Sequence, residues 1–311
     1  MSQRYSLGVL DFCHLHEGVS PADILWETLD LAPLAESFGY TRYWLAEHHT
    51  PRMAHSTPEM LLPILAGVTK KIRVGTAGVL LNMYSPFKVA SSFRLLHTIF
   101  PRRIDLGLAR GGVNEVIEQL LTGGAPPVPY DQKVRELLAF LRGTGETAVN
   151  PRGIAPPEVW VLGTKTTSME LAADNGAAFC LALFLNERHQ GLESILAEYQ
   201  DRFRPSPELP EPKWSVTFAG VCAETEAEAR RIAEEKLPSV VPTVVGTPEQ
   251  CREAVEEMRE KYGTAEMVFL DLSRAFDDRV RSYRLLAEAL ELGAGPGAPV
   301  PARSEEVAVS G

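Results

Sequence analysis

The sequence predicts an α/β fold, a (β/α)8 TIM barrel in a single domain. About eight segments with the pattern of a buried strand alternate with helical segments, which is the order that a barrel of parallel strands requires. A doubly wound open sheet is the competing architecture, and it favours a Gly-x-Gly-x-x-Gly turn after the first strand. The turn here, residues 11–20, contains a single glycine, Gly18, so the pattern favours the barrel.

The first half of the chain shows the alternation in clear steps. A strand is expected at Tyr5–Leu10, where polar and apolar residues alternate. A helix then begins at Pro21, keeps apolar residues near helical spacing, and ends at Gly39, a residue type that often closes helices. The same reasoning predicts strands at Arg42–Leu45, Ile72–Ala77 and Ile104–Leu108, helices at Pro58–Thr69, Pro86–Phe100 and Asp131–Leu141, and a helical pattern that reaches Leu121 before a Gly/Pro-rich loop at Gly123–Pro129.

The second half continues the alternation. Strands are expected at Val159–Leu162, Ala178–Ala182, Ser215–Val221 and Met267–Leu270. Helices are expected at Thr167–Asn175, which Gly176 closes, at Glu187–Phe203, at Thr225–Lys236, from a Thr247 cap to Lys261, and at Asp277–Leu290. Residues 1–292 should therefore form the barrel domain. Residues 293–311 are rich in Gly, Pro and Ala and should form a disordered tail.

Composition limits the classes of function. The chain has 311 residues, 45% of them hydrophobic, which is enough for a substantial core. Its net charge is −10 and it has no run of Lys or Arg, so nucleic acid and anionic membranes are poor partners. The four cysteines are far apart, which argues against a disulfide framework or structural zinc. No stretch reaches the ~18 apolar residues of a membrane span, and no signal region precedes the first strand. A cytoplasmic protein is expected.

The segment Tyr43–His49 is the most informative motif. A short apolar run ends in Glu47, His48 and His49, as expected where a strand end faces a solvent-accessible pocket. An imidazole has a pKa near working pH, so His48 or His49 is the candidate general acid/base, unless both serve a structural role. Adjacent residues of an extended segment point opposite ways, so one of them should face the pocket. The strand ends that should share this mouth carry Asp11, Glu47, His48, His49, Gly78, Arg110, Gly163 and Asp271.

A metal site is the rival interpretation of this motif. Its possible ligands are Glu47, His48, His49 and His55, together with Asp271. Metal-dependent barrels draw histidines from several strand ends, whereas the first strand here ends in Asp11-Phe12-Cys13 and the fifth in Gly163-Thr164. We therefore expect no metal.

Two later segments have the chemistry of an anion site. Arg110 precedes Gly111 and Gly112 directly after a strand, where glycines let backbone N–H groups approach an anion and Arg offers paired donors. The segment Gly163–Ser168 follows the next strand and places hydroxyls, Lys165 and free N–H groups at a helix N-terminus. A solvated arginine and an ordinary N-cap are the alternatives, and the pattern alone leaves them open beside a phosphate-bearing cofactor.

Small residues end the third strand, in the segment Val74–Val79. Small side chains let a planar ring lie against the backbone, and they also suit tight packing within a barrel. The residues alone favour neither interpretation.

Four motifs, in chain order, carry a resemblance to a known family. They are Trp44–His49, Val74–Val79, Arg103–Gly111 and Val245–Cys251. Together they resemble the bacterial luciferase-like flavin-dependent monooxygenase family over nearly the whole chain. The resemblance implies an enzyme that uses O2 and reduced FMN, supplied by a separate flavin reductase, with a hydroperoxide at flavin C4a as the oxygenating species.

The resemblance also implies roles for particular residues. His48 matches the family's catalytic histidine, and Arg110, with Gly111 beside it, matches the arginine that binds the flavin phosphate. Ala77 and Gly78 match a non-proline cis peptide under the flavin ring. The family's further phosphate contacts correspond to Thr164, Lys165 and Ser168.

Departures from the family pattern bear on function. Ala109 stands where the luciferase α subunit has a reactive cysteine, so thiol-linked behaviour is not expected. Thr164 replaces an acidic residue and, with Lys165, makes the phosphate corner more basic. The segment Pro238–Thr243 is short for a mobile lid, so a long-chain aldehyde substrate and light emission are not implied. Family members often dimerise through barrel helices, so a homodimer is expected.

Two alternatives within the same fold stay open. Related barrels use a deazaflavin and transfer hydride without O2, and other relatives are non-catalytic flavin-binding subunits. The substrate itself is not given by the sequence. The loops 11–20, 49–58 and 182–188 should wall the pocket, and their Phe, Leu, Met and His residues indicate a largely apolar organic molecule, with secondary metabolism as a further hypothesis. The candidate substrate-pocket residues are Phe12, His49 and His55.

Overall fold

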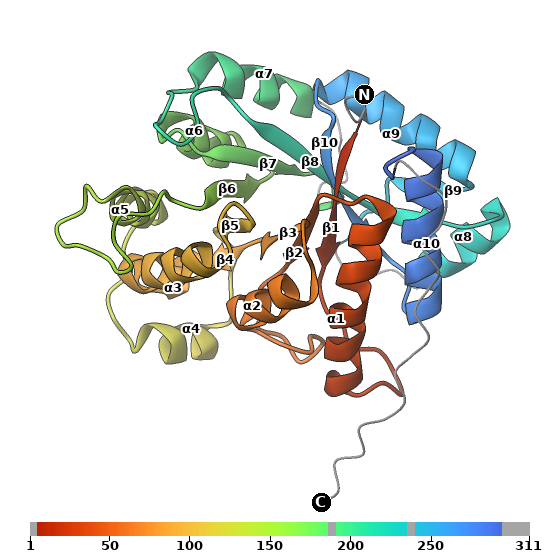
Figure 1. The fold of residues 1–311 in the computed structure, drawn as a ribbon, viewed down its shortest axis with the longest axis horizontal. Helices are drawn as coiled ribbons and strands as arrows, with labels where there is room; N and C mark the ends of the chain where they lie inside the picture. The colour runs from red at the N-terminus through yellow and green to blue at the C-terminus, as the bar shows by residue number, and fades with distance from the viewer. Residues whose placement is uncertain (1–4, 186–190, 235–239, 294–311) are drawn as a thin grey trace, which may run out of the picture.

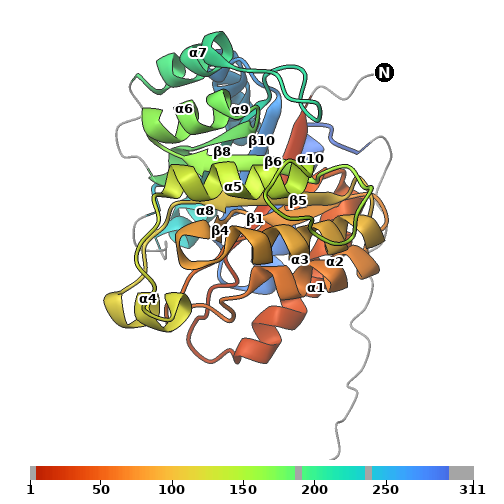
Figure 2. The ribbon, with the colours of Figure 1, turned by 90° about the vertical axis from the view of Figure 1, so that its left-hand side faces the viewer.

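The computed structural model describes residues 5–185, 191–234 and 240–293. Its centre is a closed barrel of parallel strands surrounded by helices (Figures 1 and 2). The barrel strands are β1 (Ser6–Asp11), β2 (Arg42–Leu45), β3 (Arg73–Thr76), β5 (Ile104–Ala109), β6 (Glu158–Gly163), β7 (Ala178–Ala182), β8 (Trp214–Cys222) and β10 (Glu266–Asp271). Because β10 pairs in parallel with both β8 and β1, the sheet closes on itself. The predicted (β/α)8 barrel is confirmed.

The outer layer consists of helices that follow the strands. Most of them are α1 (Pro21–Phe38), α2 (Pro58–Val68), α3 (Pro86–Ile99), α5 (Tyr130–Arg142), α6 (Thr166–Asp174), α7 (Leu192–Arg202), α9 (Pro248–Tyr262) and α10 (Phe276–Ala289). Local capping explains their bounds. Ser20 and Asp23 form a capping box at the start of α1, and Gly39 closes that helix in the left-handed conformation, with φ +97°. Thr247 caps α9, as predicted.

Shorter elements add to this frame. They are β4 (Val79–Leu80), which pairs with β5, β9 (Val244–Gly246), which pairs with β8, the helices α4 (Glu115–Thr122) and α8 (Glu226–Ala233), and the single turns η1 (Leu81–Met83) and η2 (Leu183–Leu185). The predicted helix 187–203 begins later, with α7, and residues 186–190 lie outside the described chain. The same holds for residues 235 and 236 of the predicted helix 225–236, and for the predicted tail beyond residue 293.

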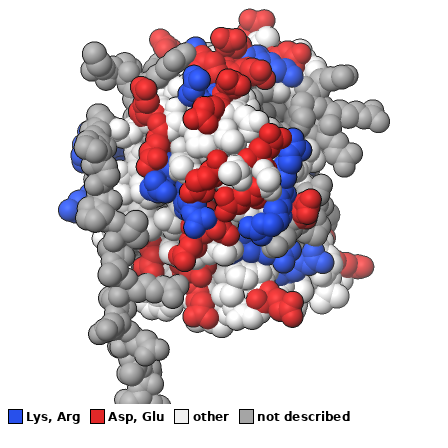
Figure 3. All heavy atoms as spheres, turned by 90° about the vertical axis from the view of Figure 1, so that its right-hand side faces the viewer, with Lys and Arg blue, Asp and Glu red and all other residues white. Residues whose placement is uncertain are grey.

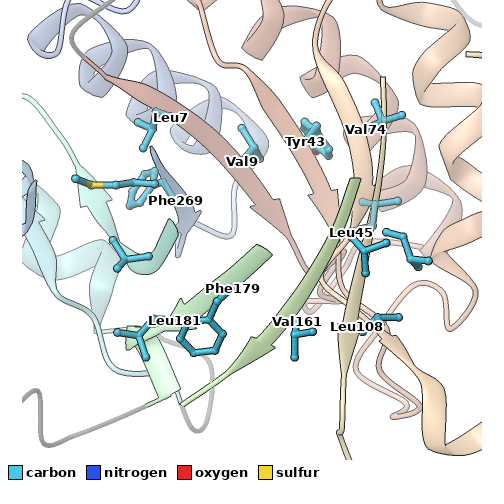
Figure 4. Packing of buried hydrophobic residues seen from close by; sticks show 14 of the residues in the cluster. Leu7, Val9, Tyr43, Leu45, Val74, Leu108, Val161, Phe179, Leu181 and Phe269 are labelled. Carbon is cyan, nitrogen blue, oxygen red and sulfur yellow. The ribbon is translucent and has the colours of Figure 1, made fainter. Parts of the chain in front are cut away.

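Alternate residues of each strand serve two apolar layers. In β2, Tyr43 and Leu45 pack outward against the helices, whereas Trp44 between them lies inside the barrel. Figure 4 shows the outward set, with Tyr43 and Leu45 beside Val74 of β3. Inside the barrel, the Trp44 ring meets Trp160 edge to face, with centroids 5.4 Å apart. The interior is therefore a packed core below the mouth.

The amino ends of the strands enclose a network of buried charges. The Asp105 side chain is 0% exposed and accepts bonds from Arg42, from Arg73 and from Trp44 Nε1, the last at 2.8 Å. Arg42 also donates to carboxylates at two other strand starts, Glu158 at 2.9 Å and Glu266 at 2.6 Å. Burial alone would raise the pKa of Asp105, but Arg42 and Arg73 hold it below its ordinary value. This network ties the strands together at the end opposite the mouth.

Candidate active site

A cavity of about 800 Å³ opens at the carboxyl ends of the strands. This volume lies within the range of small-molecule and cofactor sites. The predicted catalytic residue, His48, lines this cavity, as do two of the three predicted substrate residues, Phe12 and His49. All of the predicted cofactor residues line it as well: Ala77, Gly78, Arg110, Gly111, Thr164, Lys165 and Ser168. They follow β1, β2, β3, β5 and β6. Closure of the barrel therefore brings these segments, which are far apart in the sequence, to one mouth.

His48 follows β2 and lies half-buried in the cavity wall. Its ring stands edge-on to Phe12 from the loop after β1, with centroids 5.0 Å apart. Burial lowers the pKa of His48, and the neighbouring His49 and His55 lower it further. The imidazole is therefore neutral near pH 7 and can accept a proton from a group in the cavity.

The carboxylate of Glu47 determines what His49 can do. Glu47 is 2% exposed, and its Oε1 accepts the Tyr84 hydroxyl at 2.6 Å and lies 2.8 Å from His49 Nε2. Its Oε2 accepts the N–H of Leu80, at the end of β4, at 3.0 Å. Both imidazoles line the cavity, whereas alternation along the strand predicted one. His49 is bonded to Glu47, so His48 is the imidazole that is available for chemistry.

Sequence reasoning missed this organising role of Glu47. Its partners Leu80 and Tyr84 lie 33 and 37 positions further along the chain. Burial raises the pKa of the Tyr84 hydroxyl, and the bond to Glu47 raises it further, so Tyr84 remains a donor. The sequence signal for this role was a carboxylate at the end of an apolar run, and that signal did not identify Leu80 and Tyr84 as the partners of Glu47.

The floor of the cavity is backbone with small side chains. The Ala77–Gly78 peptide is cis, as the resemblance implied. A Cβ on Gly78 would lie 2.7 Å from the carbonyl carbon of Gly107 in β5, so glycine is what lets the two strands approach this closely. Such a floor suits a flat ring lying on the backbone.

One side of the mouth gathers cations and hydroxyls. We call Arg110, Gly111, Thr164, Lys165 and Ser168 the anion corner; all five line the cavity after β5 and β6. Lys165 is the N-cap residue of α6, and Ser168 lies in the first turn of that helix. The helix N-terminus therefore adds its N–H groups and its positive dipole end to the two cations.

Neighbouring elements hold Arg110 in place. Its guanidinium lies over the Tyr130 ring of α5, 5.1 Å from the ring centroid. Asn82 of η1 donates its side-chain amide to the Arg110 carbonyl at 3.2 Å. Gly111 has φ +46°, and a Cβ there would meet Leu80 Cδ2 at 2.2 Å, so the turn after β5 requires glycine. The donors of the anion corner fit a phosphate group.

His55 does not line the cavity, contrary to the prediction that placed it in the substrate pocket. The chain just before it pairs with the loop after β1, where the Ala54 N–H donates to the Cys13 carbonyl at 2.9 Å. Both ring nitrogens of His55 are buried, and burial lowers the pKa of the imidazole. The pairing joins distant segments, so local sequence pattern could not reveal it.

Asp11 and Asp271 end their strands but do not line the main cavity, contrary to the expectation of a shared mouth. Asp11 is buried and accepts the Tyr43 hydroxyl at 2.6 Å, with Arg279 of α10 at 3.0 Å. Asp271 lines a separate cavity of about 40 Å³, where burial raises its pKa to about 6. Arg279 of α10 therefore compensates the charge of Asp11, whereas its influence on Asp271 is small.

Two kinds of feature are absent from the residues that the structure describes. In the ranges 5–185, 191–234 and 240–293, no three His, Cys, Asp or Glu side chains are grouped so that they could hold a metal ion. Among the helices of the same ranges, none has the length and hydropathy needed to cross a bilayer.

A closed parallel barrel whose mouth combines an imidazole with an anion corner is typical of TIM-barrel enzymes. The chain belongs to the luciferase-like monooxygenase family, whose family model matches residues 6–243. It is 34% identical to N-acetyl-S-alkylcysteine monooxygenase of Bacillus subtilis, over 86% of this chain and 88% of the relative. It is 30% identical to the luciferase-like monooxygenase of Escherichia coli K12, over 86% of this chain and 83% of that relative.

A solved structure supports the assignment. The crystal structure of apo-MsnO8 superposes with a TM-score of 0.85 at 31% sequence identity, covering 94% of this chain and 99% of that one. The likeness therefore extends over the whole barrel.

Proposed function

We propose that the protein is a flavin-dependent monooxygenase that uses reduced FMN and O2 to oxygenate a largely apolar small organic molecule. The observation that carries this proposal is a single cavity that holds both the anion corner and His48. Family membership, and a relative named as a monooxygenase of N-acetyl-S-alkylcysteines, support the same activity. A separate flavin reductase would supply the reduced cofactor, and the four free, buried cysteines fit a reducing cytoplasm.

The bound cofactor would supply two electrons, so that one oxygen atom of O2 enters the substrate and the other leaves as water. Arg110 and Lys165 would hold the phosphate, and the Ala77–Gly78 floor would carry the ring. His48 would accept or return a proton at the reacting edge, because its imidazole is neutral and lines the same cavity. Phe12 and Phe184, whose rings are 6.0 Å apart, would exclude water.

Oxygen consumption separates this proposal from its two rivals. When the purified protein is given reduced FMN and a compound that it oxidises, it should consume O2. The product should contain one more oxygen atom than that compound. Turnover with a reduced deazaflavin in the absence of O2 would instead identify a hydride-transfer enzyme. Tight FMN binding without turnover of any tested compound would identify a non-catalytic flavin-binding subunit.

Replacing Arg110 should weaken FMN binding. We expect Arg110→Ala to cost about 1.5–3 kcal/mol of binding free energy, because a charge-assisted bond to the phosphate is lost. Riboflavin lacks the phosphate, so its affinity should not change. Fluorescence titration with both flavins measures the difference. The matched control is Arg135→Ala on the exposed face of α5, where the guanidinium pairs with Asp131. Equal FMN affinity in Arg110→Ala and the wild type would contradict the assignment.

The protein is also proposed to form a homodimer through α2 and α3. On α2, Met60, Ile64 and Val68 recur every four residues and are 67%, 46% and 49% exposed. On α3, which contacts α2, Leu95 and Ile99 are also exposed, at 51% and 57%. Burying such a stripe against a second copy removes it from water.

Light scattering after size-exclusion chromatography tests the dimer. The wild type should have the mass of two chains, and Ile64→Glu should shift it to one, because a buried charge opposes the contact. Leu120→Glu is the control, since Leu120 is also exposed but lies on α4. A monomeric wild type, or an Ile64→Glu protein that remains dimeric, would reject this interface.

A further inference from the structure

The described residues that line the cavity carry a net positive formal charge, whereas the chain as a whole is acidic. The chain has 41 acidic and 31 basic residues, and Figure 3 shows a face of the outer surface on which the two kinds intermingle. Among the described residues that line the cavity, the formally charged side chains are Arg52, Arg110, Lys165 and Glu47. Glu47 is buried and already accepts three donors. The cavity therefore presents an excess of unopposed positive charge.

The flavin phosphate explains two of these cations but not Arg52. Arg110 and Lys165 follow β5 and β6, whereas Arg52 lies in the loop after β2, beside the loop after β1. In the barrel, β3 and β5 separate β2 from β6. Arg52 is exposed at the mouth, and no ion pair or side-chain hydrogen bond of its guanidinium occurs within the described chain. Its charge is therefore free to meet a ligand.

Backbone contacts fix where Arg52 sits. Its carbonyl accepts the Leu15 N–H at 2.7 Å, and its own N–H donates to the Thr50 hydroxyl at 3.4 Å. Next to it, Met53 forms an antiparallel bridge with His14. Arg52, Met53 and His14 all line the cavity. The loop is thus a formed structure that presents a guanidinium and an imidazole side by side.

We propose that the substrate of this site carries an anionic group, a carboxylate, which Arg52 binds with His14 beside it at the mouth. This inference rests on the proposed function and adds the class of substrate to it. An apolar body would lie against Phe12, Met53 and Phe184, which line the same cavity. The substrate would then be amphiphilic, with its reacting atom held toward His48 and its charge held at the mouth.

Two guanidinium groups act on His14. Burial lowers the pKa of His14, and the guanidinium groups of Arg274 and Arg52 lower it further. A bound carboxylate would offset this like-charge repulsion and let the imidazole bond to it. His16 is a further neighbour of His14 on the same loop.

Two probes that differ in one charge test the proposal. N-acetyl-S-benzylcysteine has an apolar benzyl group and a carboxylate, and its carboxamide is neutral and nearly isosteric. Isothermal titration of each into the protein with bound oxidised FMN should show that the carboxylate binds about two- to fivefold more tightly. Arg52→Glu should abolish that preference, and Arg52→Lys should retain most of it. Arg135→Glu, on the exposed face of α5, is the control and should behave as the wild type.

The outcomes separate this inference from the proposed function. Equal affinity for both probes in the wild type, an unchanged preference in Arg52→Glu, or no measurable binding of the carboxylate at millimolar concentration would overturn the carboxylate site. Loss of FMN affinity in Arg52→Glu would also overturn it, because Arg52 would then belong to the cofactor phosphate. If FMN itself fails to bind, the proposed function fails, and the same pair of probes can still be titrated into the protein alone.

Discussion

Replacing His48 with Ala should reduce turnover by about 10²–10⁴-fold, the usual contribution of a positioned general acid or base. The FMN dissociation constant should change little, because we assign the phosphate to the anion corner after β5 and β6 and not to His48. Steady-state oxygen uptake, and FMN binding measured on the same preparation, give the two values. The loss should appear mainly in kcat.

The pH profile gives a second measure of His48. Burial lowers the pKa of this imidazole below its ordinary value of 6.5, and His49 and His55 lower it further. If the neutral form is the active one, activity should persist below pH 6.5 and fall only as the pH passes below the lowered pKa. That acid limb should be missing from the residual activity of His48→Asn.

A control histidine separates chemistry from folding. His97 lies on α3 outside the barrel, and its Nδ1 is buried without a partner among the described atoms. His97→Ala should therefore keep near-normal kcat. Full turnover in His48→Ala would reject the catalytic role, and equal losses in both variants would indicate a general structural effect instead.

Replacing Asp105 with Ala should lower the free energy of unfolding by about 3–5 kcal/mol, the usual cost of removing one partner from a buried charge network. Arg42 would remain buried and would lose the innermost of its carboxylates, and Trp44 Nε1 would lose its acceptor. Urea denaturation followed by tryptophan fluorescence measures the change. Asp131→Ala is the control, because that carboxylate is exposed on α5 and its pair with Arg135 is solvated. Similar unfolding midpoints for the two variants would show that the network does not stabilise the barrel.

Local sequence signals were sufficient for most of the barrel. Helix α1 begins at Pro21 after a capping box and ends before a left-handed glycine, so both of its ends are encoded nearby. The strands Arg42–Leu45 and Ala178–Ala182 have the predicted bounds because apolar runs between breakers define them. The short strands β4 and β9 were missed. Each exists through pairing with a distant strand, and the Leu80 end of β4 is also held by Glu47.

The site was predictable to the same extent and for a related reason. Residues directly after strands, such as His48 and Arg110, reach the mouth because parallel strands end on one side of a barrel. Residues further along a loop depend on how that loop pairs. His55 follows Ala54, whose N–H bonds to the Cys13 carbonyl, and it does not line the cavity. Asp11 pairs with Arg279 of α10. Neither contact can be predicted from the local sequence pattern, because each joins residues that are far apart in the chain.

A crystal structure of the protein with bound FMN would test the central claim most directly. We expect the phosphate in contact with Arg110, Lys165 and the N-terminus of α6, the ring on the Ala77–Gly78 floor, and His48 facing the ring. Flavin bound elsewhere, or a phosphate that contacts neither cation while His48 faces away from the ring, would contradict this account of the site.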